Sequence, residues 1–102
     1  MKYQLVVQFD ARTLQDFDGL LQLEESIEGE IGELGIVDGH DFGSEQFNIF
    51  VLTDAPQIAF ERILKVANNL AVTEGMCAAY RKMDNEDFTI LWPGGLSEFV
   101  VT

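Results

Sequence analysis

The sequence predicts a single α+β domain over residues 1–102, with the element order β-α-β-β-α-β followed by one further strand. Three observations predict this fold class. Residues 3–9 alternate apolar and polar side chains, which is typical of a β-strand. Residues 14–31 and 56–72 instead place their apolar side chains at helical spacing. Residues 47–53 are largely apolar on both sides, as in a central strand.

The first helix is expected to begin after Thr13, which can form a capping box with Asp16 three residues later. Its apolar side chains recur three or four residues apart and form one stripe that we expect to be buried. The helix is expected to end at three glycines spaced three residues apart, Gly29, Gly32 and Gly35. The predicted stripe consists of Phe17, Leu20, Leu23, Ile27 and Ile31.

Turn signals between apolar segments define the remaining elements. A hairpin is expected from residues 34–42 and 47–53, joined by a turn at residues 43–45. Asp54 can cap the second helix, and Pro56 suits its first turn because no amide donor is needed there. The last two predicted strands span residues 76–83 and 88–92.

This order of elements is the split β-α-β, or ferredoxin-like, pattern. Because connections are short and crossovers are right-handed, we expect an antiparallel sheet with strand order 4-1-3-2 and the additional C-terminal strand beside strand four. Both helices would then cover one face of the sheet, and strands one and three would be central.

The opposite face of the predicted sheet is only partly polar. It carries Val6, Phe50 and Leu52, and an apolar patch of this kind rarely stays bare. We expect this patch to be covered in one of three ways: by the C-terminal tail of the chain, by a second copy packed sheet to sheet, or by a small molecule. The tail residues that could cover the patch are Leu96, Phe99, Val100 and Val101.

The chain is strongly acidic, with a formal charge of −12 and a pI of about 4.1. This argues against binding to nucleic acid or to an anionic membrane, both of which need clustered Lys and Arg. Cys77 is the only cysteine, so no intrachain disulfide can form. No apolar run is long enough for a signal peptide or a membrane-spanning helix, which predicts a cytoplasmic protein. The alternative is export by a route that uses no N-terminal signal.

The densest polar cluster, residues 38–45, contains carboxylates, the only histidine and a serine, without the spacing of a calcium loop. In a regular strand, Asp38 and His40 would share a face and Asp41 would point away, and two ligands do not make a metal site. Cys77 could act with His40 only if the fold joined them. The sequence therefore predicts no metal, no cofactor and no enzymatic activity.

Glu24 falls close to the centre of the apolar stripe of the first helix. If the helix is regular, burial should raise the pKa of this carboxyl, which would suit a general acid or base. The alternative is that Glu24 lies at the edge of the sheet, or pairs with a cation such as Arg62 or Arg81.

The negative charge is concentrated in the first half of the chain. Residues 10–45 hold eleven Asp or Glu and one Arg, a net charge of −10, against −2 for the rest. Such a surface either keeps the protein soluble or docks a basic partner protein, whose association it would accelerate. The candidate partner-binding residues are Asp18, Glu25, Glu28, Glu30, Glu33, Asp38 and Asp41.

Three segments of the chain carry a resemblance: Asp38-Gly39-His40-Asp41-Phe42-Gly43-Ser44, Asn48-Ile49-Phe50-Val51 and Asp54-Ala55-Pro56. In these segments the chain resembles small, uncharacterised bacterial proteins of ferredoxin-like fold, and the topology of residues 1–92 is similar to theirs. Some proteins of this size and acidity are immunity proteins, which neutralise secreted toxins, often basic nucleases. The resemblance implies a non-enzymatic module that binds a basic protein. The alternative is a homodimeric ferredoxin-like protein that binds a small molecule.

Overall fold

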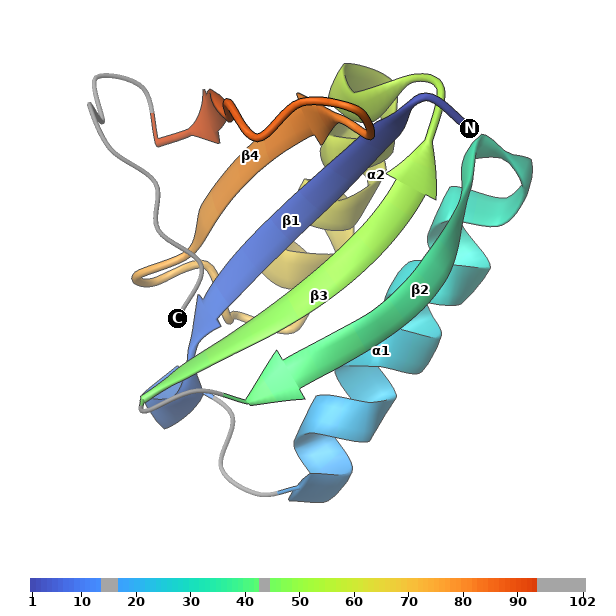
Figure 1. Cartoon of the computed structure of the whole chain (residues 1–102). Coiled ribbons are helices and arrows are strands. Elements are labelled where there is room, and N and C mark those ends of the chain that lie inside the picture. Colours follow the sequence, from blue (N-terminus) through green and yellow to red (C-terminus); the bar gives the residue numbers. More distant parts are fainter. Residues whose placement is uncertain (14–16, 43–44, 94–102) are drawn as a thin grey trace.

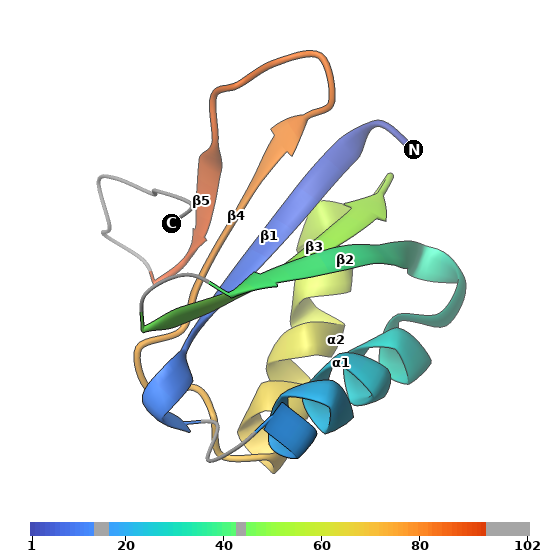
Figure 2. The ribbon, with the colours of Figure 1, turned by 60° about the horizontal axis from the view of Figure 1, so that its bottom comes forward.

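The computed structural model describes residues 1–13, 17–42 and 45–93. In this part of the chain a five-stranded antiparallel sheet carries two α-helices on one side (Figure 1, Figure 2), which confirms the predicted α+β class. The strands are β1 (Tyr3–Asp10), β2 (Gly35–Phe42), β3 (Gln46–Thr53), β4 (Cys77–Lys82) and β5 (Thr89–Trp92). The helices are α1 (Phe17–Ile31) and α2 (Pro56–Asn69), and two 3₁₀ turns are η1 (Ala11–Thr13) and η2 (Gly32–Leu34).

The strand order is β2-β3-β1-β4-β5, which counted from the other edge is β5-β4-β1-β3-β2. This arrangement is compatible with a ferredoxin-like fold. β1 and β3 are central, and their register places Val6 directly opposite Phe50. β2 and β5 form the two edges of the sheet.

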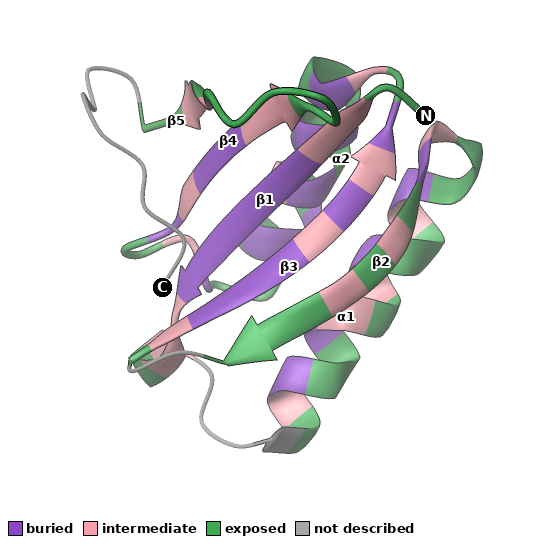
Figure 3. Cartoon of the chain, in the orientation of Figure 1, coloured by how far each residue is buried: buried purple, intermediate pink, exposed green. Residues whose placement is uncertain are grey.

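The core lies between the helices and the sheet, and Figure 3 shows buried residues along both central strands. Every second residue of β1 from Leu5 to Phe9 points into the core, because successive strand residues alternate between faces. The stripe of α1 packs against them. Four of its five predicted members are buried, and the side chain of Phe17 lies outside the description. The buried members are Leu20, Leu23, Ile27 and Ile31.

The start of α2 differs from the prediction. The Asp54 carboxylate accepts a hydrogen bond from the backbone N–H of Lys2 (2.9 Å), and the N-cap residue is Ala55, without a side-chain cap. Thr53 organises the turn instead. Its hydroxyl donates to the Leu34 carbonyl (2.6 Å) and accepts from the Ala55 N–H (3.0 Å).

The boundaries of the helices also differ from the expected ones. Thr13 belongs to η1, where its hydroxyl donates to the Asp10 carbonyl (2.7 Å), and its predicted capping partner Asp16 lies outside the described residues. α2 ends at Asn69, earlier than expected, because Ala71 adopts a φ of 57°, which a right-handed helix does not allow.

Gly35→Ala is expected to destabilise the protein. At Gly35 an added Cβ would lie 2.6 Å from the Leu52 carbonyl oxygen and 3.1 Å from the Val51 side chain, so β2 and β3 would have to move apart. We expect the free energy of unfolding, measured by urea denaturation, to fall by about 1–3 kcal/mol. The control is Gly29→Ala in α1, where an added Cβ meets nothing within 4 Å and alanine stabilises a helix by about 1 kcal/mol. Equal effects of the two substitutions would contradict the close approach at Gly35.

Candidate functional site

A β-bulge in β2 decides which of its polar side chains face the helices. The register of β2 against β3 shifts between Val37 and Gly39, so Asp38 and Gly39 together oppose one residue of β3. His40 consequently lies opposite Ile49, on the buried side of the sheet. The prediction that Asp38 and His40 share a face is therefore wrong, because the extra residue breaks the alternation.

The bulge places His40 against α1. Its Nδ1 lies 2.6 Å from Oε2 of Glu24, and the centre of its ring lies 5.4 Å from that of Phe47. Glu24 thus pairs with His40 and not with Arg62 or Arg81. Its side chain is 22% exposed at the edge of the sheet, which agrees with the alternative of an edge position; a role as general acid or base stays a prediction.

Glu24 and His40 lie at the centre of a surface where α1 runs along the edge strand β2 (Figure 1), which we name the α1–β2 edge. Leu21 and Glu28 lie three residues before and four residues after Glu24, hence on the same side of the helix. Phe42 lies two residues after His40, on the same face of the strand, and is 61% exposed. No pattern in the sequence singles out Phe42. The α1–β2 edge comprises Leu21, Glu24, Glu28, His40 and Phe42.

The seven predicted partner-binding carboxylates do not form one patch. Glu30 is paired with Lys65 of α2 (3.4 Å). Asp41 lies opposite Asn48, between two core-facing pairs and therefore on the sheet face away from the helices, and Asp38 lies on the bulge. The remaining four are exposed on α1 and η2, and we name them the acidic surface. They are Asp18, Glu25, Glu28 and Glu33.

Positive charge is scarce around the acidic surface. Arg12 is the only Lys or Arg in residues 10–45, and its Nη2 lies 2.6 Å from Oδ2 of Asp10. The side-chain hydrogen bonds from Arg12, with one from its backbone N–H, lower the pKa of Asp10 from 3.8 to about 2. Within the described ranges, no Lys, Arg or His forms an ion pair with the acidic surface.

The structure separates the residues considered for nucleophilic chemistry. Cys77 lies on β4 and His40 on β2, with β1 and β3 between them, so the two cannot act together. Burial raises the pKa of the Cys77 thiol, which leaves little reactive thiolate at neutral pH. Among residues 1–13, 17–42 and 45–93, no three His, Cys, Asp or Glu side chains lie close enough to share a metal ion.

The sheet face away from the helices is unevenly exposed. Val6 is fully buried, so it offers no surface to a second copy, whereas Phe50 and Leu52 are half-buried. Ile36 lies opposite Leu52 and is 57% exposed. The tail residues that were predicted to cover this face lie outside the described residues. Its covering by a second copy or by a small molecule stays a prediction.

Comparison with known proteins adds no assignment: no protein family matches the chain, and no curated protein matches its sequence. In the described ranges, none of the helices has the length and apolar character needed to cross a membrane.

Arg12→Ala is expected to raise the pKa of Asp10 from about 2 toward 3.8, because the carboxylate loses the guanidinium. The pKa of Asp10 is lower in the folded protein than in the unfolded chain. The pair therefore stabilises the fold above about pH 4, and this contribution is lost as the pH falls through about 2. An NMR titration of the Asp10 carboxyl measures its pKa. Lys65→Ala, which breaks a different exposed pair, is the control, and an unchanged Asp10 pKa in Arg12→Ala would contradict the assignment.

Proposed function

We propose that this chain is a non-enzymatic protein-binding module of ferredoxin-like fold, which docks a basic partner protein on the acidic surface and the adjoining α1–β2 edge. In the finer form of the proposal, the partner is a basic toxin that the chain neutralises, as immunity proteins do. The observation that carries the proposal is the set of exposed carboxylates on α1 and η2, which have no ion-paired cation in the described part of the chain.

Unpaired like charges on one surface repel one another, and a partner that supplies Lys or Arg relieves that repulsion. Glu25 and Glu28, three residues apart on α1, are neighbours of this kind. Charge complementarity accelerates association and excludes wrong partners, whereas most of the affinity comes from a few buried anchors. A docking surface of this type therefore needs an apolar anchor beside its carboxylates.

Phe42 supplies such an anchor at the end of β2, where it is 61% exposed. Aromatic side chains are enriched at the centre of interfaces, inside a polar rim. The contact between Glu24 and His40 holds β2 against α1 and so fixes the position of Phe42 two residues further on. The bulge and the carboxylates of Asp38 and Asp41 discourage another strand from pairing with this edge. We therefore expect the partner to contact side chains rather than to extend the sheet.

Glu25→Lys/Glu28→Lys is expected to abolish capture of a basic protein by the immobilised chain, because it reverses two charges of the acidic surface. The control Glu61→Lys/Glu74→Lys makes the same change in net charge at exposed positions elsewhere and should retain the partner. Calorimetry with the purified partner should give a dissociation constant that weakens roughly tenfold between about 50 and 300 mM salt, because exposed charges are screened.

Equal retention of the partner by the two double variants, or a dissociation constant independent of salt, would contradict the docking proposal. The toxin form is tested separately. Production of the captured protein should arrest bacterial growth, and co-production of the wild-type chain, but not of Glu25→Lys/Glu28→Lys, should restore it. Normal growth without the chain would reject the toxin form and leave protein binding standing.

Phe42→Ala is expected to weaken binding of the same partner by roughly tenfold to a hundredfold, as loss of an aromatic anchor does. Because the side chain is already exposed, the free energy of unfolding should change by less than about 1 kcal/mol. Ile58→Ala, at a 49% exposed position of α2, is the control. Calorimetry and urea denaturation measure the two effects, and equal weakening by both substitutions would exclude Phe42 as the anchor.

A further inference from the structure

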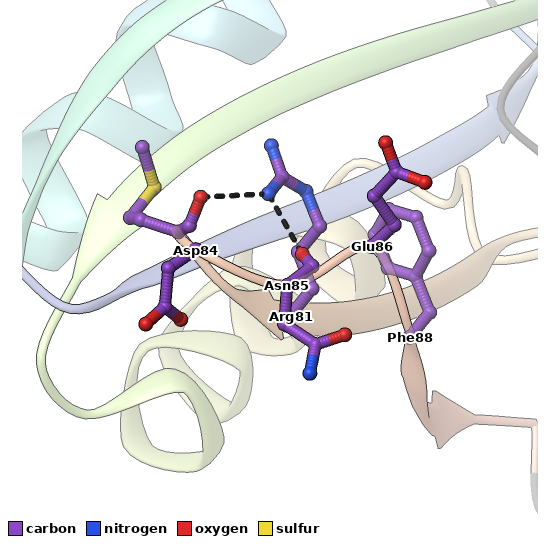
Figure 4. A pocket seen from close by; sticks show the side chains of 6 residues that line it. Arg81, Asp84, Asn85, Glu86 and Phe88 are labelled. Atoms are coloured by element: carbon purple, nitrogen blue, oxygen red, sulfur yellow. Dashed lines mark hydrogen bonds between the residues drawn. The ribbon is translucent and has the colours of Figure 1, made fainter.

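The segment between β4 and β5 is held in place by one arginine. Arg81 donates from Nη1 to the backbone carbonyls of Lys82, Met83 and Asn85 over 3.0–3.3 Å. Its Nε donates to the side-chain oxygen of Gln4 at 3.0 Å. These bonds fix the guanidinium and fold the segment around it (Figure 4).

Two charged groups beside this segment, the Arg81 guanidinium and the Glu86 carboxylate, have no charged partner in the described part of the chain. In the described part of the chain, Nη2 of Arg81 has no hydrogen-bond acceptor, and neither Arg81 nor Glu86 forms an ion pair. Figure 4 shows the guanidinium and the Glu86 carboxylate on one side of the segment without contact between them, whereas the Asp84 carboxylate points the other way. The Arg81 and Glu86 side chains line a cavity of about 440 Å³, to which Met83 and Phe88 add apolar surface.

We propose that this cavity binds a small zwitterion of the α-amino acid class with an apolar side chain. The ligand carboxylate accepts a charge-assisted hydrogen bond from Nη2 of Arg81, and its ammonium donates one to Glu86. Its side chain contacts Met83 and Phe88. The pocket is largely open to solvent, so the two charge-assisted contacts, rather than burial of the ligand, supply most of its affinity.

Singly charged ligands suit the cavity less well. Arg81 repels a metal cation, while Glu86 and the net charge of −12 repel a simple anion. A zwitterion instead places an opposite charge beside each of the two groups. A neighbouring pocket of about 540 Å³ shares Met83 and Asp84 with the first and is also lined by Lys2 and Lys82, so this part of the surface presents charges of both signs.

The probe is L-leucine, added up to about 10 mM to the isotope-labelled full chain and followed by NMR. Two matched analogues are 4-methylpentanoate, which lacks the ammonium, and 3-methylbutylamine, which lacks the carboxylate. We expect leucine to shift the amide signals of residues 81–88. Each analogue should bind about tenfold more weakly or worse, because it loses one charge-assisted contact. Glu86→Gln should weaken leucine binding to the same extent, and the control Glu61→Gln should not.

Absence of leucine-dependent shifts in this segment, equal binding of the three compounds, or undiminished binding to Glu86→Gln would overturn the proposal. Glu86→Gln is the informative variant because Arg81 also holds the segment, so its replacement would disturb the fold. β4 and the edge strand β2 are separated by β1 and β3. The result is therefore independent of whether the α1–β2 edge docks a protein.

Discussion

Burial of one face of β1 and β3 beneath both helices is the constraint on which the rest of the structure depends. Alternate residues of the two central strands meet the apolar stripes of α1 and α2 in one continuous core, and each Å² of apolar area removed from water contributes about 25 cal/mol. Because both helices pack against this face, α1 runs along β2. Its outer carboxylates are thereby concentrated at one edge of the sheet, while the segment organised by Arg81 lies beyond β4.

The sequence predicts well the features that depend only on the spacing of apolar residues within a single segment. Apolar spacing alone identifies the buried face of the strand at residues 3–9 and of the helix that carries the stripe from Leu20 to Ile31. Neither prediction needs to know which element packs against that face. The bulge at Asp38 could not be found this way, because it is a mismatch between two strands. Gly39, with a φ of 153°, is the only local trace of it, and glycines within strands also occur at tight bends and where another backbone approaches closely.

The candidate site shows the same division. Glu24 and His40 each stood out in the sequence, one as a carboxylate within an apolar stripe and the other as the only histidine, but their contact depends on the bulge and on how α1 lies against β2. Arg81, the cation that the sequence offers as a partner for Glu24, lies on β4 and instead bonds to the β4–β5 segment. The exposure of Phe42 is equally a property of its surroundings, since a phenylalanine ending a strand is usually assumed to be buried.

The hydroxyl of Thr53 joins the end of η2, the end of β3 and the start of α2 through its bonds to Leu34 and Ala55. A fluctuation that frees any one of these termini leaves the buried Thr53 hydroxyl without one of its hydrogen-bond partners. The loss of that bond loosens the other two termini. The three junctions therefore behave as one cooperative unit in native-state opening, rather than as independent fraying ends. Slow hydrogen exchange at this corner would then report on the integrity of the whole sheet–helix junction.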